Sequence, residues 1–83
     1  MASPFAIQSV DGTIPANSNQ SDAVIAPTVS GYTFRFWISV VSVGFSAPIY
    51  TSYPTSKSAT AWASSSSTSV RAIRFWALYT KDI

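Results

Sequence analysis

The sequence predicts an all-β protein, a small antiparallel β-sandwich of jelly-roll-like form with about six short strands. Three observations lead to this fold class. Strand-favouring residues dominate, since Glu is absent and Leu occurs once. Hydrophobic residues alternate with a period of two along two long segments, and no segment shows a helical period. Turn-forming residues separate the candidate strands. With 83 residues, the whole chain, residues 1–83, is expected to form a single domain.

The first strand is predicted at Phe5 to Val10 and is expected to end at the turn signal Asp11-Gly12. Residues 1–4 before this strand and residues 13–21 after it are rich in small, polar and turn-forming residues. We expect these two segments to be extended or flexible, because they contain little apolar surface to bury.

The second strand is predicted at Asp22 to Thr28, and a tight turn at Ser30-Gly31 is expected to join it in a hairpin to the third strand, Tyr32 to Val43. Side chains of a strand alternate between two faces. The third strand is therefore expected to place its core stripe on one face and a mixed set on the other. The core stripe is Tyr32, Phe34, Phe36, Ile38 and Val40, and the other set is Thr33, Arg35, Trp37, Ser39 and Val41.

Three further strands are predicted, at Phe45 to Tyr53, at Thr60 to Ala63, and at Val70 to Thr80. The first of these is expected to be short, because Pro48 and Pro54 limit it. The serine-rich run Ser64 to Ser69 has two interpretations, a flexible surface loop or an extended strand lined with hydroxyls where another chain approaches. The last strand is expected to contribute Ile73, Phe75 and Tyr79 to the core.

One side-chain pattern occurs twice, as Phe34-Arg35-Phe36-Trp37 and as Ile73-Arg74-Phe75-Trp76. In a regular strand each copy places two large apolar residues on one face and an Arg-x-Trp pair on the other. Trp and Arg are common hot spots of protein interfaces. The candidate interface therefore consists of Arg35, Trp37, Arg74, Trp76 and Trp62.

The residue inventory argues against catalysis and metal binding. The chain has no Cys and no His, and its only side-chain carboxylates, Asp11, Asp22 and Asp82, are widely spaced. A nucleophilic serine would have only Lys57 or Lys81 as a base, and no spacing indicates such a pair. We therefore predict a protein that is not an enzyme, with no catalytic residues, no cofactor site and no metal site.

The charge content indicates a surface that other chains cover. Charged residues make up 10% of the sequence and hydrophobic residues 47%, and the net charge is +2. So few charges give an isolated monomer poor colloidal stability, and oligomerisation is a usual way to stabilise so small a domain. Five cations give a weak electrostatic footprint for nucleic acid. The longest apolar stretch is too short to span a membrane as a helix, and the first residues show no targeting segment.

An alternative function is carbohydrate binding by a small oligomeric lectin. Exposed aromatic rings can stack on sugars, and polar side chains can bind their hydroxyls. The same aromatic residues are enriched in protein interfaces, so both functions remain open. The candidate aromatics are Trp37, Trp62, Trp76, Tyr50 and Tyr53, and the candidate polar groups are Asp11, Asn17 and Asn19.

The stretch from Ser21 to Trp37 resembles the hairpin of small all-β virion proteins of tailed phages. The shared features are a short Ala/Val strand, a Ser-Gly turn and a long strand with one internal Arg. Capsid cement or decoration proteins of this kind are similar in length, lack Cys, and are rich in Ser, Thr, Ala and Val. The resemblance implies a structural component of a virion that binds neighbouring capsid or tail subunits, and it assigns no role to any single residue.

Overall fold

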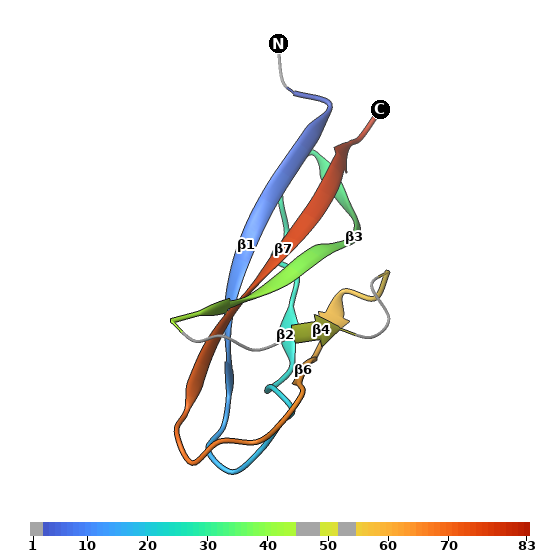
Figure 1. The fold of residues 1–83 in the computed structure, drawn as a ribbon. Coiled ribbons are helices and arrows are strands. Elements are labelled where there is room, and N and C mark those ends of the chain that lie inside the picture. Colours follow the sequence, from blue (N-terminus) through green and yellow to red (C-terminus); the bar gives the residue numbers. More distant parts are fainter. Residues whose placement is uncertain (1–2, 45–48, 52–54) are drawn as a thin grey trace.

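The structure, a computed structural model, describes residues 3–44, 49–51 and 55–83 of the chain (Figure 1). The described residues contain strands and no helix, and their strand pairings are antiparallel. The predicted all-β class is therefore confirmed. The strands are β1 (Phe5–Ile14), β2 (Val24–Ile25), β3 (Tyr32–Val43), β4 (Ile49–Thr51), β5 (Ser58–Ala59), β6 (Ala61–Ala63) and β7 (Arg71–Lys81).

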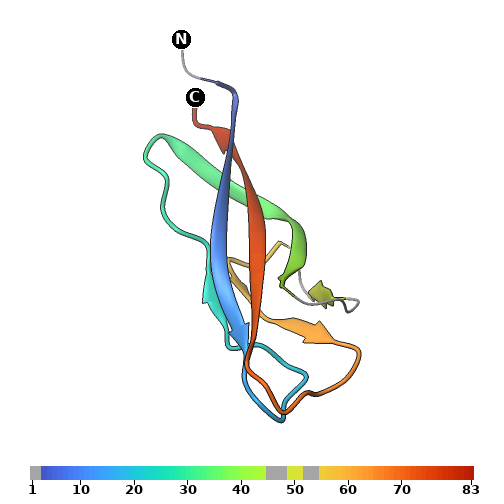
Figure 2. The ribbon, with the colours of Figure 1, turned by 60° about the vertical axis from the view of Figure 1, so that its left-hand side comes forward.

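The three long strands form the main sheet, in the order β1-β7-β3. β7 lies in the centre and pairs with β1 over ten residues without a register shift, from Phe5 opposite Thr80 to Ile14 opposite Arg71. The last strand of the chain therefore lies between the first and the third. The sheet twists along its length, as comparison of Figures 1 and 2 shows, and both ends of the chain lie at the same end of the molecule.

Two short ribbons, β2-β5 and β4-β6, complete the fold. Their small apolar residues, among them Val24, Ala59, Ala61 and Ala63, are buried in one cluster with residues of the main sheet. We call the side of the main sheet that faces this cluster the inner face and the opposite side the outer face. The molecule measures 47 × 21 × 17 Å, and its radius of gyration is 13.8 Å. A compact domain of this length would have a radius of about 12 Å, so the chain is extended for its size.

Four aromatic rings form the centre of the core. The Trp37 ring contacts Phe34 and Phe75 edge to face, with centroids 5.4 and 5.5 Å apart, and Phe34 contacts Tyr79 at 5.8 Å. Each polar group of these rings has a partner, since Trp37 Nε1 donates to the Ser56 carbonyl at 2.8 Å and the Tyr79 hydroxyl donates to the carbonyl of Pro27. Buried aromatic rings with satisfied polar ends are a stable core arrangement.

A buried arginine connects two loops at one end of the sheet. The Arg71 guanidinium donates to the carbonyls of Ser18 and Ser65, each at 2.9 Å. Beside it, the Asn17 amide donates to the Ser67 carbonyl at 2.6 Å. The serine run forms bends and no strand, so the loop interpretation of this run is confirmed and the strand interpretation is wrong.

The predicted end of the first strand is wrong. Asp11 and Gly12 form no turn, because they pair with Arg74 and Ile73 and the strand continues to Ile14. Gly12 is needed for close packing here. A Cβ at this position would lie 3.0 Å from Cε1 of Phe75. Thr13 and Ile14, expected in a loop, therefore belong to β1.

The predicted hairpin is also wrong, although its turn is present. Gly31 has a φ of 82°, and the Tyr32 amide donates to the Val29 carbonyl at 3.0 Å. The two strands beside this turn do not pair with each other, because β2 pairs with β5 and β3 pairs with β7. Of the strand predicted at Phe45 to Tyr53, residues 45–48 and 52–54 lie outside the described residues, and β4 lies between them.

The core stripe was predicted correctly for β7 and only in part for β3. Ile73, Phe75 and Tyr79 are buried as expected. In β3, Phe34 is buried and Tyr32 packs against the core, but Phe36 and Ile38 are 42% and 48% exposed. Trp37, expected on the opposite face, is only 3% exposed and belongs to the core.

Two irregularities in the pairing of β3 with β7 explain this difference. The register shifts between Phe34 and Phe36 and again between Trp37 and Ser39. A β-bulge places two residues of one strand opposite one residue of its partner, so the alternation of faces slips by one position at each bulge. Phe34, Trp37 and Val40 therefore point inward with a period of three.

Candidate interaction surface

The outer face of the main sheet is built from rows of side chains that run across its three strands. Directly opposed residues of antiparallel strands share a face, so the register defines the rows. We name three of them. The apolar row is Ile7, Leu78 and Phe36; the tryptophan row is Ser9, Trp76 and Ser39; and the ion-pair row is Asp11, Arg74 and Val41.

Large hydrophobic side chains are concentrated on this face. Of the nine that are strongly exposed in the described part of the chain, six lie on the outer face. An isolated exposed hydrophobic residue is ordinary, but a contiguous group of them indicates an interaction site. The six and their exposed fractions are Phe5 57%, Ile7 55%, Ile38 48%, Phe36 42%, Val41 42% and Val43 41%.

The bulges of β3 contribute two members of this group. Phe36 follows the first bulge, and Ile38 lies at the second. Without the bulges both side chains would point inward. Bulges often re-aim side chains near functional sites. The same two irregularities therefore place Trp37 in the core and Phe36 and Ile38 on the outer face.

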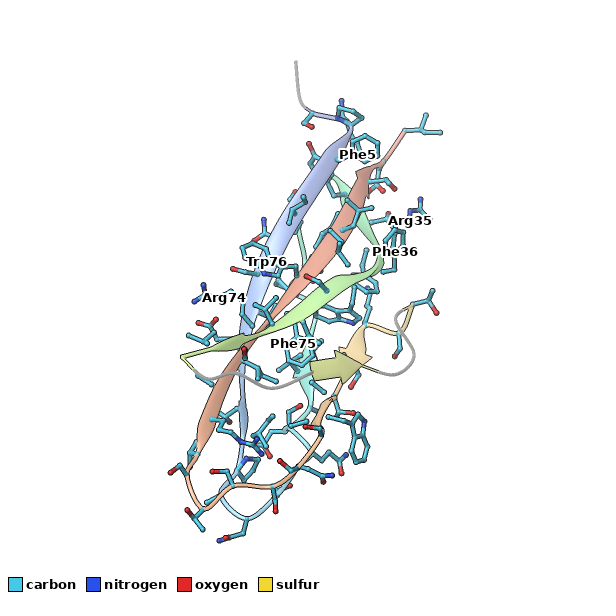
Figure 3. The ribbon with its side chains drawn as sticks, in the orientation of Figure 1. Phe5, Arg35, Phe36, Arg74, Phe75 and Trp76 are labelled. Atoms are coloured by element: carbon cyan, nitrogen blue, oxygen red, sulfur yellow. The ribbon has the colours of Figure 1, made fainter. Side chains whose placement is uncertain are left out.

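Trp76 is the aromatic residue at the middle of the outer face. Figure 3 shows Trp76 and Phe75 on opposite sides of β7, as expected for neighbouring residues of a regular strand. Its cross-strand neighbours, Ser9 and Ser39, have small side chains. The indole is half-buried and has no bulky neighbour directly opposite it in either strand.

Both arginines of the outer face donate a hydrogen bond within the chain, Arg74 to a carboxylate and Arg35 to a hydroxyl. Arg74 Nε donates to Asp11 Oδ1 at 2.8 Å, and Arg35 Nε donates to Thr80 Oγ1 at 2.6 Å. The Arg74 and Asp11 side chains are 41% and 76% exposed, so water screens their attraction and the pair contributes little to stability. The pair makes the ion-pair row electrically neutral.

The outer face changes direction along the molecule. Figure 3 shows Arg35 and Phe36 projecting to one side of the twisted sheet and Arg74 and Trp76 projecting to the other. Twist of this kind is inherent to β-sheets, and bulges increase it. The surface is therefore a twisted ribbon and not a flat plate.

The structure brings together three of the five residues predicted at the interface. Arg35, Arg74 and Trp76 lie on the outer face. Trp37 is buried in the core, so its assignment to the interface is wrong. Trp62 lies on β6, where it is half-buried and bridges to Gln20, so it belongs to a different part of the molecule.

Sequence reasoning missed the hydrophobic part of this surface. Phe5 and Ile7 alternate with small residues in β1, which is the signal of an apolar face, but the partner strand had to be known before they could be joined to Phe36 and Ile38. The three strands come from the beginning, the middle and the end of the sequence. Only the β1-β7-β3 order brings their apolar residues into one patch.

Pockets and clusters of metal-ligating side chains are the usual places where small ligands bind. The part of the chain that the structure describes contains no pocket and no group of three or more metal-ligating side chains. Burial raises the pKa of the Tyr79 hydroxyl, but this group points into the core and donates to the Pro27 carbonyl. The described residues contain no helix that is long and apolar enough to cross a membrane.

Comparisons of the chain with protein-family models, with curated proteins and with solved structures gave no match. The outer face and the chemistry of its residues are therefore the basis for assigning a function.

Proposed function

We infer that the chain is a non-enzymatic structural assembly protein that binds neighbouring protein subunits through the outer face. The observation that carries this proposal is the contrast between the two faces of one sheet. The inner face packs on the core, whereas the outer face carries six exposed large hydrophobic side chains. Covering apolar surface contributes roughly 25 cal/mol per Å², so a protein partner would stabilise this face substantially.

The composition supports the same function. Only 10% of the residues are charged, and on the outer face Asp11 and Arg74 pair with each other while Arg35 donates to the Thr80 hydroxyl. Each apolar face of a sheet needs a layer that covers it. The short ribbons cover the inner face, and a neighbouring subunit would cover the outer face. The resemblance of Ser21 to Trp37 to virion proteins of tailed phages suggests the larger particle. We propose a capsid cement or decoration protein, or a tail component, located in the virion.

The alternative, a sugar-binding lectin, has less support. A stacking platform needs exposed rings that lie close together. Of its candidate aromatics, Trp37 is inside the core, Trp62 is on β6, and Trp76 is on the outer face. Tyr53 lies outside the described residues. The separation of the three tryptophans favours assembly over sugar binding.

Sedimentation of the protein from the cells that produce it tests the proposed function. In a density gradient, the parent chain should be found in fractions far heavier than its own 8.9 kDa. The variant Ile7→Lys/Ile38→Lys should shift to light fractions, because it places two charges on the outer face. Ile25→Lys is the matched control, since Ile25 is 69% exposed on β2 and lies away from that face.

Two results would contradict the proposal. One is a parent chain that sediments only at the 8.9 kDa mass of a single chain. The other is retention of the parent on an immobilised oligosaccharide that Trp76→Ala abolishes, which would favour the lectin.

A further inference from the structure

We propose that the partner on the outer face is a second copy of this chain, so that two main sheets pack face to face and close a β-sandwich between two molecules. This inference rests on the proposed function, because it names the subunit that covers the same face. Two copies related by a two-fold axis bury the same patch on each molecule, and the assembly closes as a dimer.

The exposed area fits the requirement of a dimer. An aromatic side chain buries roughly 150–250 Å² when fully covered, and Ile and Val bury less. The six half-exposed side chains with the partly exposed Trp76 and Leu78 therefore leave at most roughly 600–700 Å² of apolar surface. The largest patch of an ordinary monomer is about 300–600 Å². A standard interface takes about 800 Å² from each partner. The polar residues at the margin of the outer face supply the difference.

The twist of the outer face determines which partner surface can contact it along its whole length. A flat or convex protein would contact only part of a surface whose direction changes along a 47 Å molecule. Two sheets with the same twist pack along their whole length, about 10 Å apart and rotated by about 30°. A second copy has the same twist and the same length, so it matches this surface from end to end.

The order of the rows defines how the two copies are related. A two-fold axis parallel to β7 places each row against its own counterpart, so the apolar rows meet each other and the ion-pair rows meet each other. An axis across the strands would instead place the apolar row on the ion-pair row and leave Asp11 and Arg74 against hydrocarbon, which is costly. In the parallel arrangement the axis places Arg74 of one copy beside Arg74 of the other and each Asp11 opposite Val41 of the other copy. Each arginine keeps the carboxylate of its own chain, so the charged groups of both copies stay within one neutral row. The structure therefore favours the axis along β7.

Native mass measurement across a range of protein concentrations tests the second copy. The parent and the control Ile25→Lys should reach twice the 8.9 kDa mass of one chain. Ile7→Lys and Ile38→Lys should each raise the dissociation constant at least about 30-fold, as expected for hot-spot residues. Circular dichroism checks that each variant is folded. Both substitutions are at exposed positions, so the monomer should keep its strands.

Three results would overturn the proposal. A folded parent that stays monomeric at the highest concentration excludes the second copy, a trimer excludes a closed face-to-face pair, and an unchanged dimer in both lysine variants places the interface elsewhere. If the parent is monomeric alone but sediments with a large particle in a manner that Ile38→Lys abolishes, the proposed function stands and this inference fails. If the parent neither forms a dimer nor sediments with a large particle, the proposed function and this inference both fail.

A distance measurement tests the orientation. The chain has no native Cys, so Ile83→Cys carries a single spin label at the exposed C-terminus. With the two-fold axis along β7 both C-termini lie at one end, and the label separation should be short, on the order of the 10 Å sheet spacing plus two label tethers. A separation near the 47 Å length of the molecule would overturn the parallel arrangement.

Discussion

Alanine substitution at Trp37 should destabilise the protein far more than the same change at its neighbour Phe36. The two aromatic residues are adjacent in sequence and lie on opposite faces of the strand, and the first bulge decides which of them points to the core. Trp37 is 3% exposed, contacts two core rings and donates to the Ser56 carbonyl, whereas Phe36 is 42% exposed on the outer face. A strand with regular alternation would reverse this order.

The expected losses of stability for Trp37→Ala and Phe36→Ala differ severalfold. Truncation of a buried aromatic residue costs about 3–5 kcal/mol. Phe36 has lost only part of its exposure on folding, and full burial of Phe contributes about 1.5–3 kcal/mol, so Phe36→Ala should cost about 1 kcal/mol. A chain of this length has about 4–12 kcal/mol of stability in total. Because each kcal/mol lowers Tm by about 4–8 °C in a domain of this size, Trp37→Ala should lower Tm by roughly 12–40 °C.

Urea unfolding followed by circular dichroism measures both free energies of unfolding. The protein concentration must be low and equal for all samples, since self-association would add to the apparent stability of the folded state. If Trp37→Ala does not fold, Trp37→Phe keeps an aromatic ring but removes the bond to the Ser56 carbonyl, and it should cost about 1–2 kcal/mol. A loss for Phe36→Ala that equals or exceeds the loss at Trp37 would refute the two-bulge arrangement.

Three further predictions concern the inner face and can be checked by the same urea measurements. Gly12→Ala should lower the free energy of unfolding by about 1–3 kcal/mol, because its Cβ would lie 3.0 Å from Phe75. The neighbouring control Thr13→Ala should change the free energy of unfolding little. Equal effects of the two substitutions would contradict the close packing at Gly12. Burial raises the pKa of Tyr79, so the folded state keeps a proton that the unfolded chain loses, and stability should fall as pH rises above about 10. Tyr79→Phe should remove the contribution of Tyr79 to this loss of stability at high pH. A variant with the same dependence of stability on pH as the parent would contradict this role of Tyr79. Arg71→Met keeps most of the side-chain volume but loses two hydrogen bonds to loop carbonyls, so it should lower the free energy of unfolding by about 2–3 kcal/mol. A decrease under about 0.5 kcal/mol would show that these hydrogen bonds are not formed.

The all-β class and the last strand could be predicted from sequence because their signals are local. In β7, Ile73, Phe75 and Tyr79 fall on alternate positions, and the pairing of this strand has no shift with β1. The pattern of faces in a strand depends only on alternation while the register stays regular. The face assignment of β7 therefore held for each of these residues.

The face assignment of β3 could not be predicted in the same way. From Phe34 to Val41 both alternate sets contain large apolar side chains, so each phase of the pattern gives a plausible core. The position of the bulges depends on contacts far away in sequence, namely the fit of the Trp37 ring against Phe75 and the Ser56 carbonyl that accepts its N–H. A pattern with a period of two has no information about such partners.

The strand order was beyond sequence reasoning for a related reason. The Ser30-Gly31 turn is a local signal, and a hairpin is the usual outcome of a turn between two strands. Here β2 has two residues and pairs with β5, while the ten residues of β1 pair with β7. The longer pairing buries more apolar surface than a short hairpin could, and it joins the two ends of the chain.

The composition of β3 explains why the outer face is apolar in this protein. Large hydrophobic residues occupy both alternate sets of the strand, so some of them must point away from the core whichever register the strand adopts. The two bulges only choose which ones: they direct Trp37 to the interior, where its N–H finds a carbonyl, and direct Phe36 and Ile38 outward. Residues of β1 and β7 then extend the patch, since Ile7 and Leu78 lie in the same row as Phe36. A single layer with apolar residues on both sides cannot bury both within one short chain. The proposed association therefore follows from the composition of β3, and the bulges set the pattern of side chains that a partner would match.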